Sequence, residues 1–309
     1  MTTRGRNRIR RGPRRIRRTL VLGLVGAALA VAGASAAFAG TIHNQASPNW
    51  AGWVALAVPR SQRLADHFTT VNGSWVQPAA TCSSARSTFA AFWVGLGGYS
   101  LHSKALEQIG SEADCDRQGQ LFYYAWYELV PRPPVTIHKL RITPGDAISA
   151  SVHVSSNTVK VSLTDLTTGK SFTKTLTMRS PNPDTSAADW ITEAPSNCNG
   201  DNRCKPLLLT DFGQIPFTSA SAASIGYGGR HSGSIDDPQW DHGEIVLSSN
   251  GSLTYSPRDQ SYALPSLLGL NGSFTVEYGA GGATGPTGPS GPSGASGSTG
   301  STGTSGSGA

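Results

Sequence analysis

The clearest pattern in this chain is an alternation of apolar and polar positions, which is typical of β-strands. Ile148, Val152 and Val154 alternate with polar residues. The polar turn at residues 155–157 follows, and apolar residues alternate again over 159–163. Two alternating stretches joined by a short polar turn predict a β-hairpin at this place.

The same pattern recurs elsewhere along the chain. Residues 164–169, Thr-Asp-Leu-Thr-Thr-Gly, separate a further pair of expected strands. Residues 245–247, the turn Asn250-Gly251, and then Leu253 and Tyr255 predict a second hairpin. No long stretch carries a helical apolar stripe with capping residues. Many short strands divided by Gly, Pro and Asn turns predict an all-β fold, either a sandwich or a barrel.

The first 39 residues differ from this pattern. Residues 1–18 hold nine arginines and no acid, residues 20–31 are apolar, and Ala37-Phe-Ala39 follows. This order predicts a secretory signal peptide over residues 1–39, and Arg17-Arg18 would suit twin-arginine export. A retained anchor is the alternative, but the apolar run is too short to span a bilayer as a mature helix.

The last part of the chain also differs. Glycine recurs at every third residue from Gly282 to Gly306, as in collagen, but only the first part carries proline. We therefore expect residues 281–309 to be an extended, flexible spacer. Residues 40–280 remain, and their length suits one large domain.

Removing the leader changes the charge and narrows the partners. The formal net charge of +6 falls to −3 without the nine arginines, and no basic patch interleaved with aromatic residues remains. We expect no nucleic-acid partner, no membrane contact after signal removal, and a secreted monomer. All four cysteines lie in the exported part and predict disulfides. Three pairings are possible, and proximity along the chain favours Cys82–Cys115 and Cys198–Cys204.

Several common catalytic motifs are missing from the expected domain. It contains no Gly-x-Ser-x-Gly elbow, no His-Glu-x-x-His and no Asp-Thr-Gly. His242 lies among Asp236, Asp237, Asp241 and Glu244, and such a group could hold a cation. The usual calcium-loop spacing is absent, so a solvated acidic loop is the preferred interpretation. We therefore expect no metal and no other cofactor.

Nine short motifs, rich in tryptophan and glycine, follow one another in a fixed order. Together they resemble the glutamic peptidases, the eqolisins, over most of residues 47–220. The motifs are Ser47-Pro-Asn-Trp-Ala-Gly52, Gly73-Ser-Trp-Val-Gln-Pro78, Phe92-Trp-Val-Gly-Leu-Gly-Gly98, Ala105-Leu-Glu-Gln-Ile-Gly110, Ala125-Trp-Tyr-Glu-Leu-Val-Pro131, Pro144-Gly-Asp-Ala-Ile148, Leu166-Thr-Thr-Gly-Lys170, Ala188-Asp-Trp-Ile-Thr-Glu193, and Asp211-Phe-Gly213 with Phe217.

The resemblance implies a fold and a chemistry. The fold would be a β-sandwich of two bent antiparallel sheets, concanavalin-like or jelly-roll-like, with a substrate cleft on its concave face. The activity would be endopeptidase activity on proteins or peptides at acidic pH. Glu193 matches the family's catalytic glutamate, a general base, and Gln108 its catalytic glutamine, a donor to the oxyanion. Many fungal members have Asp where this chain has Gly97, which leaves the pH optimum open.

Strand alternation sorts the neighbours of the two catalytic candidates. Glu107 should point to the opposite face from Gln108, which makes it a poor substitute. Asp189, four residues before Glu193, should share its face. We assign four residues to substrate binding and cleft support: Trp93, Trp126, Glu128 and Asp189.

Two other functions fit part of the sequence. A polysaccharide-active or carbohydrate-binding sandwich would also use an aromatic cleft, with Glu128 and Glu193 as acid and base. It has no evident need for Gln108. A non-catalytic surface module on a spacer would bind without turnover, and the tail does not distinguish it from an enzyme.

Overall fold

The computed structural model describes residues 42–57, 67–83, 85–198, 204–226, 228–248, 261–269 and 271–280. Regular structure in these ranges consists of strands alone, which confirms the all-β fold, and they contain no helix that could cross a membrane. The predicted signal peptide and spacer lie outside the described residues. In chain order the strands are β1 (Ile42–Ser47), β2 (Trp50–Leu56), β3 (His67–Val76), β4 (Thr88–Gly97), β5 (Leu106–Cys115), β6 (Leu121–Val130), β7 (Val135–Thr136), β8 (Ala147–Ser155), β9 (Thr158–Asp165), β10 (Lys170–Thr177), β11 (Ala187–Glu193), β12 (Ser196–Cys198), β13 (Cys204–Pro206), β14 (Gln214–Gly226), β15 (Gly229–Ser234), β16 (Asp241–Ser248), β17 (Ser261–Pro265) and β18 (Phe274–Ala280).

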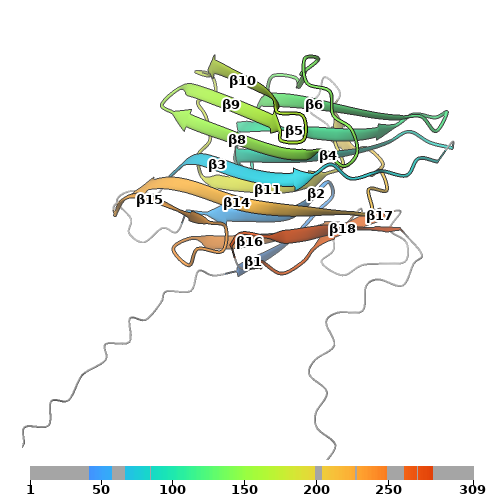
Figure 1. The fold of residues 1–309 in the computed structure, drawn as a ribbon. Helices are drawn as coiled ribbons and strands as arrows, with labels where there is room; N and C mark the ends of the chain where they lie inside the picture. The colour runs from blue at the N-terminus through green and yellow to red at the C-terminus, as the bar shows by residue number, and fades with distance from the viewer. Residues whose placement is uncertain are drawn as a thin grey trace, which may run out of the picture. The chain divides into compact units, whose positions relative to one another are not determined.

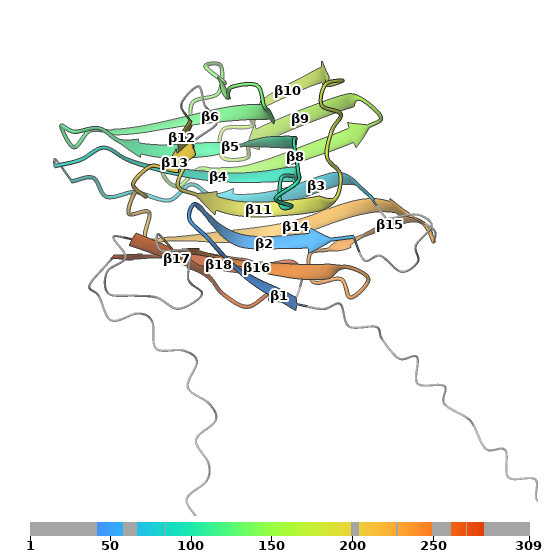
Figure 2. The ribbon, with the colours of Figure 1, turned by 180° about the vertical axis from the view of Figure 1, so that it is seen from behind.

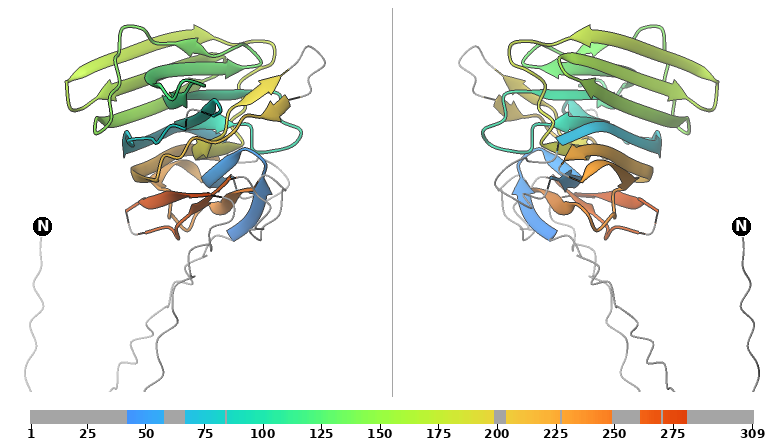
Figure 3. Two further views of the ribbon diagram at one scale, coloured as in Figure 1. Left: turned by 90° about the vertical axis from the view of Figure 1, so that its right-hand side faces the viewer. Right: turned by 90° about the vertical axis from the view of Figure 1, so that its left-hand side faces the viewer.

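Hydrogen bonds join 16 of these strands into one sheet that doubles back on itself. One half runs β10-β9-β8-β3-β14-β18, the other runs β16-β2-β11-β4-β5-β6-β7, and β17 links them. Strands β3 and β8 lie against β4, and β9 lies against β5. The halves therefore pack face to face as two layers, with β8 and β9 in front in Figure 1 and β4 and β5 in front in Figure 2. Figure 3 shows the layers from either side, and this is the predicted β-sandwich.

The predicted hairpins occur where the described residues allow a comparison. Strands β8 and β9 pair antiparallel up to Ser155 and Thr158, and Ser156 takes a positive φ of 52° in the turn. The turn at residues 164–169 joins β9 to β10, with Gly169 at φ 71°. Strand β16 forms as predicted, and β17 is its antiparallel partner. The expected return strand at Leu253 and Tyr255 lies outside the described residues.

Alternate residues of each strand face different apolar clusters. On β4, Phe92 and Val94 join the large core between the layers. Trp93, between them, joins a smaller cluster that includes Leu106 and Ile191. Because side chains alternate along a strand, this smaller cluster lies on the other face of β2, β11, β4, β5 and β6. We call this the site face.

Two disulfides connect the cysteines in the predicted pairs. Cys82 is bonded to Cys115 at the end of β5, and Cys198 to Cys204 across the β12–β13 hairpin. The second bond lies just beyond β11, five residues after Glu193.

Candidate functional site

Glu193 is the last residue of β11 and lies on the site face. It is opposite Trp50 of β2 and Ala91 of β4. It is two residues from Ile191, a member of the smaller apolar cluster, so both side chains point to the same face of β11. Its side chain is partly exposed, so solvent reaches the end of this strand.

Gln108 is the third residue of β5 and lies on the same face. It is opposite Gly95 of β4 and Glu128 of β6. It is two residues from Leu106 of the smaller apolar cluster, so both side chains point to the site face. Only 4% of it is exposed. Its Nε2 donates a hydrogen bond to Glu128 Oε2 at 2.7 Å, while its Oε1 has no partner among the described residues.

Strand β4 lies between the two catalytic candidates. Two strand spacings and an offset of four residues along β4 place their Cα atoms about 17 Å apart. Trp93 stands midway on β4, and its Nε1 donates a hydrogen bond to Glu193 Oε2 at 2.9 Å. Glu193 and Gln108 therefore share one face of one sheet, with the Trp93 indole between them.

Small residues make room for this indole. A Cβ on Gly110 would lie 2.7 Å from Trp93 Cβ and 2.1 Å from the carbonyl oxygen of Phe92. A Cβ on Gly95 would lie 2.9 Å from Trp93 Cζ3. Trp50 packs edge-on against Trp93 with ring centroids 5.0 Å apart. The glycines and the second indole thus define where the Trp93 N–H points.

The Glu193 carboxylate accepts a second hydrogen bond, from Asn49. Asn49 Nδ2 donates to Oε1 at 3.0 Å, so each oxygen has one N–H partner. Burial nevertheless raises the pKa of Glu193 to about 7, while hydrogen bonds from Trp93, Trp50 and Asn49 act in the opposite direction. The negative charge of Glu128 adds to the rise. A carboxyl group with such a pKa can both take and return a proton near neutrality.

Further acids lie along the site face. Burial raises the pKa of Glu128, and it raises the pKa of Asp114 to about 6. Glu112 is two residues beyond Gly110 and opposite Ala91, and burial with the nearby Asp114 raises its pKa well above the usual range. Several of these groups are therefore neutral in acid, where their mutual repulsion disappears.

The residues predicted to bind substrate differ in their access to it. Glu128 is partly exposed. Trp126 is 5% exposed, and its Nε1 has no hydrogen-bond partner among the described residues. Trp93 and Asp189 have no exposed surface. Of the two roles expected for these residues, substrate binding and cleft support, full burial favours support of the site from beneath.

Glu107 lies on the opposite side of β5 from Gln108, as strand alternation predicts. It is two residues from Ile109, which belongs to the core between the layers, so both side chains point into that core. It has no exposed surface, and neither carboxylate oxygen has a hydrogen-bond partner in the described part of the chain. Glu107 is therefore a buried acid below the site.

The acidic group around His242 does not gather into a metal centre. No three His, Cys, Asp or Glu side chains within the described ranges come together in a way that could hold a metal ion. Two histidines pair with single aspartates: His231 Nε2 lies 3.0 Å from Asp237 Oδ2, and His43 Nε2 lies 3.7 Å from Asp241 Oδ2. His242 itself is 6% exposed, and burial lowers its pKa.

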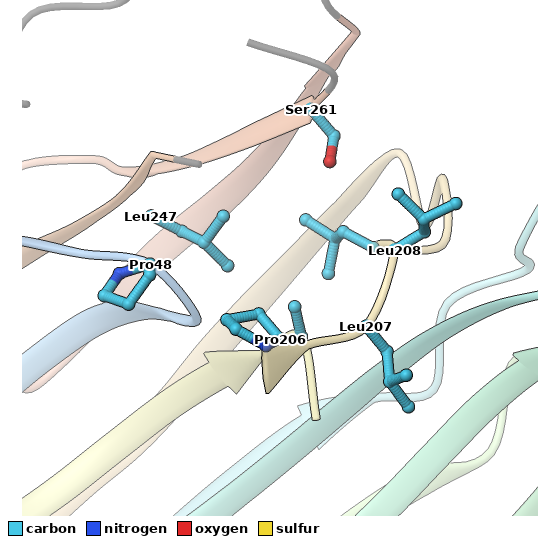
Figure 4. A pocket seen from close by; sticks show the side chains of 8 residues that line it. Pro48, Pro206, Leu207, Leu208, Leu247 and Ser261 are labelled. Carbon is cyan, nitrogen blue, oxygen red and sulfur yellow. The ribbon is translucent and has the colours of Figure 1, made fainter. Parts of the chain in front are cut away.

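An apolar hollow adjoins the turn that carries Asn49. Figure 4 shows Pro48, Leu207, Leu208 and Leu247 around it, from the β1–β2 turn, the segment after β13, and β16. Ala194, the residue after Glu193, also lines it. A backbone hydrogen bond from Ala194 N–H to Asn49 O, at 2.8 Å, links this turn to the end of β11.

Sequence reasoning missed two members of the site. Asn49 belongs to the first motif, but nothing in the sequence links it to a residue 144 positions away. Glu112 could have been found, since it is four residues after Gln108 on the same strand and therefore on the same face.

Comparison with known proteins agrees with these observations. The sequence profile of the Peptidase A4 family matches residues 48–253. Aspergillopepsin-2 of Aspergillus niger is 29% identical over 208 residues, covering 60% of this chain and 68% of that protein. Scytalidopepsin B of Scytalidium lignicola is 29% identical over 195 residues, covering 62% and 68%.

A solved structure supports the fold. Scytalido-glutamic peptidase, crystallised with a transition-state analogue inhibitor, matches with a TM-score of 0.57 at 24% identity. The match covers 75% of this chain and 98% of that one. Of the functions considered, these matches favour the peptidase over the polysaccharide-active sandwich and the binding module. The chain belongs to the Peptidase A4 family, the glutamic peptidases or eqolisins, and is an endopeptidase.

Proposed function

We propose that this protein is a secreted acid endopeptidase in which Glu193 is the general base and Gln108 stabilises the oxyanion. One observation carries the proposal. Glu193 accepts N–H donors on both carboxylate oxygens and shares a sheet face with Gln108, while the Trp93 indole lies between them.

The reaction needs one proton to move twice. Glu193 takes a proton from water, and the resulting hydroxide attacks the carbonyl carbon of the scissile peptide. Gln108 Nε2 bears two N–H groups, of which one bonds Glu128, so the other is available to the tetrahedral oxyanion. Glu193 then returns the proton to the leaving nitrogen as the C–N bond breaks. The neutral amide of Gln108 keeps its donors at every pH.

We base a working pH on the acidic side of neutrality on two opposing effects. Glu193 must be ionised to act as a base, so the rate should rise as the pH approaches about 7. The folded state loses stability over the same range, because the buried Glu107 and Asp189 hold protons that they must release. Activity should therefore peak below neutral pH.

The surrounding residues would have separate tasks. Glu128 and Trp126 are proposed to meet the substrate, since Glu128 is partly exposed and Trp126 keeps 5% of its surface exposed beside it. Trp93 and Asp189 would hold the strands beneath. We further propose that residues 1–39 direct export, that residues 40–280 form the peptidase domain, and that residues 281–309 are a spacer. The domain would act as a monomer on proteins or peptides.

Replacing Gln108 by Ala tests the oxyanion role. Loss of one such donor should lower kcat on denatured casein by about 10²–10³ with KM little changed. Glu244→Gln is a suitable control, because Glu244 is a partly exposed glutamate on β16 outside the site. Gln108→Ala with unchanged kcat would refute the assignment. Activity that is sensitive to a metal chelator or to pepstatin would also count against it.

A further inference from the structure

The turn between β1 and β2 connects directly to the Glu193 carboxylate. Trp93 reaches Glu193 from the neighbouring strand, but Asn49 reaches it from a turn 144 residues earlier in the chain. A loop residue with such a contact must be held in place by other interactions, or the contact would be lost to solvent.

Ser47 provides most of these interactions. It is 8% exposed, and its Oγ donates to Asn49 Oδ1 at 3.1 Å. The same oxygen accepts hydrogen bonds from the backbone N–H groups of Asn49, at 3.3 Å, and Trp50, at 3.1 Å. One hydroxyl therefore closes the turn and fixes the Asn49 side chain within it.

This arrangement settles which way the Asn49 amide points. Its Oδ1 accepts from the Ser47 hydroxyl, so its Nδ2 is the group that faces Glu193. The backbone binds the same two regions together, since Ala194 N donates to Asn49 O at 2.8 Å. The amide thus presents a donor, and not an acceptor, to Glu193 Oε1.

We infer that Asn49, oriented by Ser47, is a positioning residue that keeps Glu193 ionised and correctly turned for catalysis; this rests on the proposed role of Glu193 as the base. An N–H donor stabilises the carboxylate over the carboxylic acid. Because an amide does not titrate, the donor persists throughout the acid range. With one oxygen held by Trp93 and the other by Asn49, the remaining lone pairs have defined directions toward the water.

The pH profile of kcat/KM distinguishes this role from simple structural support. A hydrogen bond to a charged group typically corresponds to about a tenfold to hundredfold effect. Asn49→Ala should therefore lower kcat/KM by that factor at acidic pH. The acid limb, which is the part of the profile where kcat/KM rises with pH, should move to a pH higher by about one unit or more. Ser47→Ala should shift the limb in the same direction by less, and KM should change little in either variant.

Two further variants complete the test. Asn49→Asp preserves the size of the side chain but replaces the donor with an oxygen, so it should move the limb at least as far as Asn49→Ala. Asn72→Ala is the matched control, because Asn72 Nδ2 donates to Ser221 Oγ, at 3.4 Å, and not to Glu193. It should leave the limb in place. If Asn49→Ala does not fold, Ser47→Ala and Asn49→Asp still decide the question.

An unmoved acid limb in the folded variants would overturn the inference. That result differs from a failure of the proposed function, which Glu193→Gln reports separately. If Glu193→Gln is inactive and the limb is unmoved in the Asn49 and Ser47 variants, only the positioning role is lost. If Glu193→Gln is active, the general-base assignment is wrong and the positioning role falls with it.

Discussion

Glu107 offers a quantitative prediction about pH and stability. Burial raises its pKa from 4.5 to about 9, and the nearby Asp184 carboxylate adds to the rise. The folded state therefore binds this proton more tightly than the unfolded state. Stability from this group is complete below about pH 4.5 and is lost as the pH rises toward about 9.

The magnitude follows from the gap between the two values. Each pH unit above 4.5 costs the folded state about 1.4 kcal/mol, which amounts to about 3 kcal/mol at pH 7. Burial also raises the pKa of Asp189 well above its usual range, so it adds a loss of the same sign. Asp184 does not mask the effect, because hydrogen bonds lower its pKa and its contribution is lost only in stronger acid.

Replacing Glu107 by Gln removes the titration and keeps the shape. The free energy of unfolding, measured with urea, should fall in the wild type between about pH 4 and about pH 7. In Glu107→Gln, this fall should be smaller by about 3 kcal/mol. Glu277→Gln is the control, because Glu277 is exposed on β18 and its replacement should leave the wild-type drop unchanged. An equal drop in Glu107→Gln and the wild type would refute the assignment of a buried, protonated Glu107.

Two other predictions concern the indole and a disulfide. Trp93→Phe removes the N–H that holds Glu193 Oε2, so the acid limb of kcat/KM should move up by about one pH unit or more. Trp75→Phe is the control, since Trp75 Nε1 bonds Ser111 in the core at 3.0 Å; it should lower stability without moving the limb. Removing the Cys82–Cys115 bond, with a separation of 33 residues, should cost about 2–4 kcal/mol in urea unfolding. No loss would mean that the bond constrains little.

The local strand pattern was predictable, and the order of strands in the sheet was not. Alternation and a polar turn are properties of adjacent residues, so the β8–β9 hairpin could be identified from them. The pairing of β3 with both β8 and β14 joins segments that are far apart in the chain. Such contacts depend on how the two layers cover each other, which no local pattern contains.

The site shows the same division. Strand parity was sufficient to place Glu107 and Gln108 on opposite faces of β5 and Asp189 on the face of Glu193. Burial was not predictable, because the exposure of Asp189 depends on side chains that other strands bring over it. The role of Asn49 depends on a hydrogen bond across 144 residues, which only the folded turn creates.

The most direct test of the central claim is the pH profile of kcat/KM for wild type and Glu193→Gln on a denatured protein substrate. The substitution preserves the size of the side chain and removes the group that must exchange the proton. The wild type should show a rate that rises with pH through the acid range and peaks below neutrality, and Glu193→Gln should show no turnover above background at any pH while remaining folded. A folded Glu193→Gln variant with the wild-type profile would contradict the account.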